Sequence, residues 1–320
     1  YYRYIESYSG TSAGSVFVQN LASLSLSSGT DNGGTYTRIS RKRHKMRPAT
    51  SVRVAMNCNF NGYDANVVKR VGLFTSFNGV FYQVNSDLSI HIRRRLANGT
   101  LVEKVIERAD FNVDPLDGTV SAYDFTPNSV HNFDVNITNY VGTTTTSVGG
   151  TTIYNVTFTV SDRSKFFAGI KGRITGVSPS AFNQVTMVSS VDGGDNAVGA
   201  GNVTFTMLVN PGSFTSLSSA KFSHSYLYHQ HVMGFDFNGN RMNQIRFFIN
   251  GLKGRVVLHL EDFGDTLSTP WSNAPAISTR YEIYNTAAPG YRPSFLVSSE
   301  TVTVEGPASE NKAFGTAYNN

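Results

Sequence analysis

The sequence predicts an all-β protein: an antiparallel β-sandwich with jelly-roll-like connections and an inserted small β module. Short segments alternate apolar and polar residues and are separated by Asn-Gly and other turn signals, while helical periodicity is almost absent. The composition is also typical of β-rich proteins, with 22 Phe, 16 Tyr and only 15% charged residues. A chain of 320 residues is long enough to bury a substantial core.

Residues 1–40 are rich in Ser, Gly and Thr and contain one strand-like stretch at residues 15–18. We expect an N-terminal arm there. Residues 50–60 alternate as a strand and place Cys58 among its apolar positions, as a small core residue. Because Cys58 is the only cysteine, neither an intrachain disulfide nor a multi-cysteine zinc site can form.

A meander of antiparallel strands is predicted from residue 70 onward. Strands at 70–75 and 80–84 lead into a hairpin at 89–107, where Asn98-Gly99 is typical of a two-residue type I′ turn. That turn places Arg94 opposite Glu103, on a mainly apolar face. The other face then carries the remaining polar side chains and is built for solvent or a partner: His91, Arg93, Arg95 and Lys104.

Further strands are predicted at residues 152–160, 172–175, 184–188 and 202–208, and then at 242–249, 254–260, 280–285 and 299–304. The expected organisation is an N-terminal arm (1–40), a split β-sandwich (41–130 and 233–290), an inserted β module (131–232), and a C-terminal strand and tail (291–320).

The net charge of +5 is unevenly distributed, because basic residues gather between Arg38 and Arg47. Such a cluster suits nucleic acid, an anionic surface or acidic protein neighbours. No nucleic-acid-binding motif accompanies it, so we expect no nucleic-acid partner. Candidate interaction residues are Arg41, Lys42 and Arg43 here, and Arg93 and Arg95 on the hairpin. The sequence contains no run of eighteen apolar residues, so no membrane span is predicted.

Two patterns resemble catalytic or metal sites. Residues 10–14 (GTSAG) match the serine-hydrolase elbow, but a strand-like segment follows where the elbow requires a helix. His229 and His231 are two residues apart and would share a face of a strand, as metal ligands can. No carboxylate nearby completes that site, so an aromatic-rich strand explains the two histidines better.

Acidic residues give no complete site either. The loop at 236–247 begins like a calcium loop but has Arg241 at the sixth position and Phe247 at the twelfth. Glu261, Asp262 and Asp265 could supply carboxylates for glycoside cleavage, but they fit a charged strand end better. We therefore expect no catalytic residue, no bound metal and no cofactor, and a protein that is not an enzyme.

Several segments together resemble structural proteins of tailed phages and of large algal and giant DNA viruses. These are residues 71–74 (VGLF), 78–82 (NGVFY), 115–118 (PLDG) and 280–283 (RYEI). More than a hundred residues separate the last two segments. Within this intervening stretch, residues 169–183 resemble a small β module of such virion proteins. The resemblance implies a virion location, virion proteins as partners and a split sandwich.

We therefore expect a virion structural protein, in a capsid, vertex or fibre, that self-associates and docks to other virion proteins. It would form a homo-oligomer, and an edge strand or arm could extend a neighbour's sheet. The alternative is a carbohydrate-binding module for host attachment, with a host-surface glycan as partner and Trp271 among its sugar-binding residues. The third hypothesis is a polysaccharide-degrading enzyme carried on a fibre.

Overall fold

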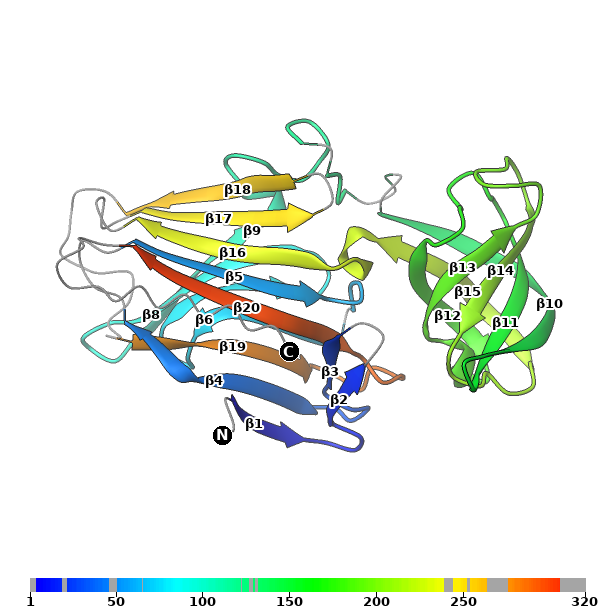
Figure 1. The fold of residues 1–320 in the computed structure, drawn as a ribbon, viewed down its shortest axis with the longest axis horizontal. Coiled ribbons are helices and arrows are strands. Elements are labelled where there is room, and N and C mark those ends of the chain that lie inside the picture. Colours follow the sequence, from blue (N-terminus) through cyan, green and yellow to red (C-terminus); the bar gives the residue numbers. More distant parts are fainter. Residues whose placement is uncertain are drawn as a thin grey trace. The chain divides into compact units, whose positions relative to one another are not determined.

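The structure is a computed structural model that describes residues 4–18, 22–45, 51–64, 66–121, 123–126, 129, 132–238, 244–251, 254–263 and 276–305. The chain forms two compact units: Tyr1–Ala122 with Gln230–Asn320, and Tyr123–His229. Regular structure in the described ranges is antiparallel strand, apart from 3-10 helices at Arg108–Asp110 (η2), Ser180–Phe182 (η3) and Tyr226–Tyr228 (η4). The prediction of an antiparallel β-sandwich with an inserted small β module is confirmed (Figure 1).

The first unit is built from two sheets, one in front of the other in Figure 1. The first sheet runs, in spatial order, through β1 (Tyr4–Ser9), β4 (Thr35–Lys45), β19 (Ala276–Asn285), β6 (Val67–Phe74), β7 (Gly79–Val84), β8 (Leu88–Arg95) and β9 (Leu101–Glu107). The second runs through β18 (Gly254–Asp262), β17 (Gln244–Gly251), β16 (His231–Asn238), β5 (Ser51–Asn59), β20 (Phe295–Glu305), β3 (Ser23–Ser27) and β2 (Gly14–Val18).

The chain crosses repeatedly between these sheets. It leaves the first sheet after β4 to form β5 in the second and returns for β6, and later it crosses from β18 to β19 and back to β20. As a result β5 lies between β16 and β20, which come from the last third of the chain. These crossovers give the sandwich its jelly-roll-like connections.

The core between the two sheets follows the alternation seen in the sequence. On β5, Val54, Met56 and Cys58 are fully buried, which fits the core position predicted for Cys58. Tyr82 on β7 spans the gap: its hydroxyl donates to the carbonyl oxygens of Gly234 (2.9 Å) and Phe248 (3.0 Å) in the second sheet. A buried phenol needs such partners, and here they join the two sheets.

One ion pair is buried in the same unit. The Lys69 ammonium on β6 donates to Asp64 (2.5 Å) and to the carbonyl oxygens of Phe60 (2.5 Å) and Gly62 (3.1 Å). Burial lowers the pKa of Lys69 to about 7, while these oxygen acceptors favour the charged form. The pair fixes the chain between β5 and β6 and is part of the scaffold.

The second unit is a closed barrel in the order β10 (Asn132–Val148), β11 (Thr151–Val160), β14 (Gly201–Met207), β13 (Val185–Val191), β12 (Lys171–Ser178) and β15 (Ser216–Ser225). Pairing of β10 with β15 closes it. Phenylalanines fill the interior, including Phe158, Phe166, Phe205 and Phe222, all fully buried. With its own core, this unit overlaps the segment predicted as an insert, 131–232.

The N-terminal segment differs from the predicted arm. Within residues 1–40, β1 and β4 belong to the first sheet, and β2 and β3 to the second. A Ser- and Thr-rich composition is compatible with edge strands, whose partners a single sequence does not reveal. At the other end, β20 contains the predicted strand at residues 299–304 and lies in the second sheet, between β5 and β3. Residues 306–320 lie outside the described residues.

The predicted type I′ turn of the β8–β9 hairpin is wrong. Leu96 N–H donates to Thr100 O (2.8 Å) and Gly99 N–H to Leu96 O (2.9 Å), and Gly99 has a φ of +85° while Asn98 has no positive φ. This is a three-residue loop with a type I turn and a bulged glycine. The strand register is therefore shifted by one residue, and Glu103 lies opposite Arg93 instead of Arg94.

Candidate interaction face on strands β6 to β9

The outer side of the first sheet carries arginine, aromatic and carboxylate side chains on neighbouring strands. Tyr82 points into the core toward the second sheet, so its chain neighbours Phe81 and Gln83 point outward. The same alternation turns alternate residues of β6, β8, β9 and β19 outward. We call this set the arginine–aromatic face: Arg70, Phe74, Phe81, His91, Arg93, Arg95, Glu103, Arg280 and Glu282.

Phe81 lies at the centre of this face, although it is fully buried. It is opposite Gly72, whose missing side chain leaves room for the Cα and Cβ of Phe81. The Phe74 ring centroid is 4.6 Å from that of Phe81, and the His91 ring stacks on it at 4.8 Å. Side chains of the face itself therefore cover this outward-pointing ring.

Two guanidinium groups complete the cover. Arg93 lies 4.9 Å and Arg70 5.3 Å from the Phe81 ring centroid, within the range of cation–π attraction. Arg70 also contacts the Tyr284 ring, at 4.9 Å. The planar guanidinium suits this combination of stacking and hydrogen bonding, which a lysine ammonium would not reproduce.

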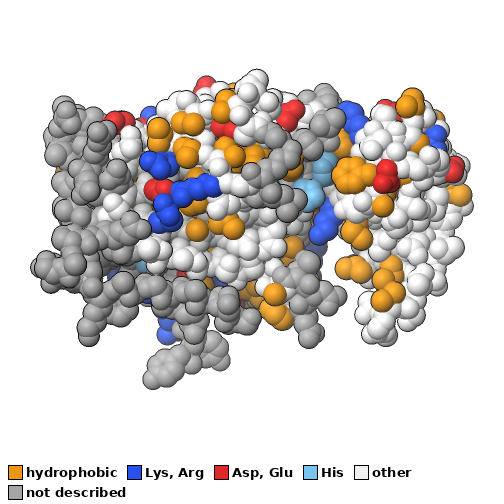
Figure 2. Space-filling model, turned by 45° about the horizontal axis from the view of Figure 1, so that its top comes forward, with side chains coloured by type: hydrophobic (Ala, Val, Ile, Leu, Met, Phe, Trp, Pro, Cys, Tyr) orange, Lys and Arg blue, Asp and Glu red, His pale blue; other side chains and the backbone are white. Residues whose placement is uncertain are grey.

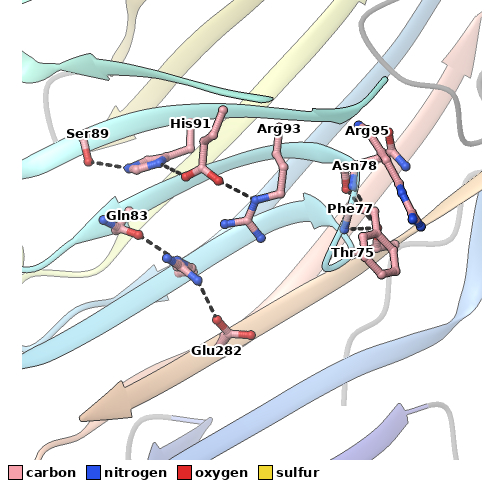
Figure 3. A network of polar contacts seen from close by, with 11 residues as sticks. Thr75, Phe77, Asn78, Gln83, Ser89, His91, Arg93, Arg95 and Glu282 are labelled. Carbon is pink, nitrogen blue, oxygen red and sulfur yellow. Dashed lines mark hydrogen bonds and ion pairs between the residues drawn. The ribbon is translucent and has the colours of Figure 1, made fainter. Parts of the chain in front are cut away.

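Glu103 holds the β8 side of the face in place. Its carboxylate contacts His91 Nδ1 at 2.6 Å and accepts from Arg93 Nε at 2.5 Å, while His91 Nε2 contacts the Ser89 hydroxyl at 2.9 Å (Figure 3). Burial alone would raise the pKa of Glu103, but the hydrogen bonds and charges of His91 and Arg93 lower it to about 2.

Glu282 on β19 does the same for the β6 side. It accepts from Arg70 Nη1 at 3.0 Å and also from Arg280, and Arg70 Nε donates to Gln83 at 2.7 Å (Figure 3). The arginines of this part of the face are thus held by fixed acceptors. Their positions are set before any partner arrives, while the single Glu282 carboxylate balances only one of the two arginine charges.

At the edge of the face the side chains are more exposed. Phe77, in the β6–β7 turn, is 50% exposed, and the Arg95 guanidinium lies 4.8 Å from its ring centroid. Thr75 Oγ1 accepts from the backbone N–H groups of Phe77 (3.1 Å) and Asn78 (3.0 Å), which fixes the turn (Figure 3). Arg95 donates from Nε to Gly99 O (3.2 Å). We call Phe77 and Arg95 the exposed rim.

The second sheet has a similar arrangement on its own outer side. The Phe248 ring lies over Gly234, and the Arg255 guanidinium covers that ring at 3.8 Å. Asp236 accepts from Arg53 (2.7 Å) and from Arg255 (2.5 Å). Basic, acidic and hydrophobic side chains lie close together on the surface shown in Figure 2. Asp236 is thus a strand residue bound to arginines and does not start a calcium loop.

The predicted interaction residues fall into two separate groups. Arg93 and Arg95 lie on β8 within the arginine–aromatic face. Arg41, Lys42 and Arg43 are exposed on β4, from which β19, β6 and β7 separate β8 in the sheet. The structure therefore does not bring the two sets together.

The predicted placement of His229 and His231 on one strand is wrong. Tyr226–Tyr228 form η4 with His229 as its C-cap, and His231 begins β16. The two histidines also belong to different compact units. In the described ranges, no group of three or more His, Cys, Asp or Glu residues is arranged to hold a metal ion.

The remaining acidic and serine candidates have ordinary structural surroundings. Glu261 on β18 accepts from Lys104 (2.7 Å) and contacts His259 (3.2 Å). Ser12 lies in the turn before strand β2, where the elbow would need a helix. Asp265 and Trp271 lie outside the described residues. No helix of the described part is long and apolar enough to cross a membrane.

Sequence reasoning missed Arg70, Glu103 and Glu282 as parts of one network. The wrong turn type placed Glu103 opposite Arg94 instead of Arg93. Glu282 pairs with Arg70, which lies 212 positions earlier in the chain. The RYEI segment that contains Glu282 was a signal for a strand, but it does not show which strands flank it.

Comparison with known proteins adds little. No protein-family model matches the chain, and no curated protein matches it. The carbohydrate recognition domain of Emp46p, in its metal-free form, is similar over 94% of this chain and 87% of that one, with 6% identity and a TM-score of 0.31. The corresponding domain of Emp47p gives 7% identity and a TM-score of 0.31 over 95% and 89%. Likeness this weak supports no assignment of function.

Proposed function

We propose that this chain is a virion structural protein that acts by docking to neighbouring proteins, with the arginine–aromatic face as one docking surface. The observation that carries the docking role is the exposed rim, Phe77 with Arg95, beside a set of arginines already held in place. Arginine and aromatic side chains are the residues that most often dominate binding at protein interfaces.

The fixed ion pairs favour docking for an energetic reason. Ordering flexible side chains at an interface opposes binding, and here Glu103 and Glu282 have already ordered Arg93 and Arg70. The virion setting rests on the resemblance of the turn and strand segments to phage and large-virus structural proteins.

The test is made on purified virus particles. Quantitative mass spectrometry is expected to find the chain among the particle proteins. Hydrogen exchange is expected to show protection of residues 75–78 and 95–101 in the particle relative to the isolated chain. If purified particles lack the chain, the virion role is wrong. If they contain it but these residues gain no protection, this face is not the docking surface.

Glycan binding is the second candidate, and one observation favours it. The exposed Phe77 ring lies beside the hydrogen-bonding groups of Arg95 and Asn78, a combination of apolar surface and directed polar groups that ligand sites share. A glycan array probed with the purified chain tests this. Binding that is lost in Phe77→Ala would support a glycan site at the rim, and an array without signal would reject it.

A further inference from the structure

Lys69 is a lysine on the core-facing side of a strand. On β6 it alternates with Val67 and Val71, which are buried between the two sheets, and its own side chain is only 1% exposed. The Asp64 side chain is 2% exposed, so the two form the most deeply buried ion pair among the described residues. The attraction between two charges repays their removal from water only with additional hydrogen bonds, and a neutral product would avoid that cost.

The Asp64 carboxyl group is fixed through both its backbone and its side chain. The Asp64 N–H donates to Asn85 O (3.0 Å), and the Asp64 carbonyl oxygen accepts from Val67 N–H (3.0 Å). The hydroxyl of Tyr291, in the segment before β20, donates to Oδ1, whereas Lys69 Nζ contacts Oδ2 at 2.5 Å. The two carboxyl oxygens thus have different partners, a phenol on one and an amine on the other.

The Lys69 nitrogen lies close to the carboxyl carbon. Oδ2 is bonded to Cγ at about 1.2 Å, so Nζ lies within about 3.7 Å of Cγ. Groups held about 3–3.5 Å apart in a fixed orientation react as if at very high concentration. Burial lowers the pKa of Lys69 to about 7, so part of the amine is neutral at neutral pH, and the neutral form is the nucleophile.

We propose that the side chains of Lys69 and Asp64 condense to an intramolecular amide, an isopeptide bond. A proton first moves from Nζ to Oδ2 across their contact. Nζ then attacks Cγ, so that the Nζ–Cγ bond forms and the Cγ–Oδ2 bond breaks, with its electron pair going to oxygen. Oδ2 leaves as water with two of the three ammonium protons, and the third stays on the amide nitrogen. The step balances without any co-reactant.

The same surroundings suit both the reaction and its product. Negative charge develops on Oδ1 during the attack, where the Tyr291 hydroxyl is already placed to stabilise it. Oδ1 then becomes the amide oxygen and keeps that hydrogen bond. The remaining N–H can donate to the carbonyl oxygen of Phe60 or Gly62, to which Nζ already donates at 2.5 and 3.1 Å. Two buried charges disappear, and residues 64–69 close into a covalent ring.

Mass spectrometry of the full chain tests this bond, which goes beyond the docking function and does not depend on it. The folded protein is expected to be lighter than its sequence by one water, about 18 Da. Trypsin should fail to cut after Lys69 and should release residues 54–70 as one peptide that carries the loss. Lys221 and Asp134 are the matched control, because they contact at 2.6 Å but are 43% and 51% exposed. Trypsin should still cut after Lys221.

Variants assign the bond to these side chains. Lys69→Met and Asp64→Ala should each keep the full sequence mass. Tyr291→Phe should condense roughly tenfold or more slowly than wild type, while its circular dichroism spectrum stays the same. Because the first two variants could fail to fold, the wild-type chain decides. A wild-type chain of full sequence mass would overturn the inference and leave an ordinary ion pair. A chain one water lighter that trypsin still cuts after Lys69 would also overturn it, since the water was then lost elsewhere.

Discussion

Phe81 on β7 lies opposite Gly72 on β6, and a Cβ atom built on residue 72 would lie 2.6 Å from the Cβ of Phe81. The same atom would lie 2.3 Å from the carbonyl oxygen of Val80. The Val80 carbonyl oxygen belongs to the backbone and the Phe81 Cβ is bonded directly to it, so neither atom can rotate away from an added Cβ. The strand that carries Phe81 therefore depends, for its close approach to β6, on a glycine in the neighbouring strand.

Gly72→Ala should therefore destabilise the first unit by about 1–3 kcal/mol, the usual effect of overpacking a tight site. Denaturant unfolding followed by far-UV circular dichroism measures this. Gly142→Ala is the control, because an added Cβ there meets nothing within 4 Å. An unchanged midpoint for Gly72→Ala would show that β6 and β7 are farther apart than they are in the structure.

The β8–β9 turn gives a prediction that separates the two turn types. Only Gly99 has a positive φ, so Gly99→Val should cost about 1–3 kcal/mol, whereas Asn98→Ala should cost much less. Thermal unfolding of the two variants is the measurement. Similar large losses in both would support the type I′ turn, which needs positive φ at both positions.

The turn also shows how far sequence reasoning reaches. Alternation in residues 50–60 predicted β5 and its core positions because the period of a strand does not depend on its neighbours. The Asn98-Gly99 pair predicted the hairpin, but it also predicted a two-residue loop where the structure has a three-residue one. Because the loop is one residue longer than predicted, Glu103 lies opposite Arg93 and not opposite Arg94. The ion pair of Arg70 with Glu282 was beyond reach, since it depends on which distant strands become neighbours.

Tyr82→Phe should weaken the contact between the two sheets. The substitution keeps the ring, which packs 5.2 Å from that of Phe235, and removes the donor to Gly234 and Phe248. A loss of about 1–2 kcal/mol is expected from these hydrogen bonds. Chemical denaturation is the assay, and Tyr8→Phe serves as the control because Tyr8 is 65% exposed. Equal stability of both variants would mean that the Tyr82 hydroxyl does not join the sheets.

Acid should weaken the arginine–aromatic face through Glu103. Its pKa is about 2 in the folded chain, below its ordinary value of 4.5, so the folded state binds fewer protons than the unfolded state between these values. The stabilisation from Glu103 is thus complete above about pH 4.5 and is lost as the pH falls toward 2. Glu103→Gln removes this contribution at every pH.

The free energy of unfolding, measured by denaturation from pH 7 to pH 2, should therefore differ most between wild type and Glu103→Gln near neutral pH, and the difference should shrink below pH 4.5. Glu107→Gln is the matched control: Glu107 is exposed on the same strand and forms no ion pair with any residue that the structure describes. A constant difference down to pH 2 would contradict the lowered pKa of Glu103. It would mean that His91 and Arg93 are held by other contacts, because a carboxylate that stabilises the fold only when ionised must lose that effect on protonation.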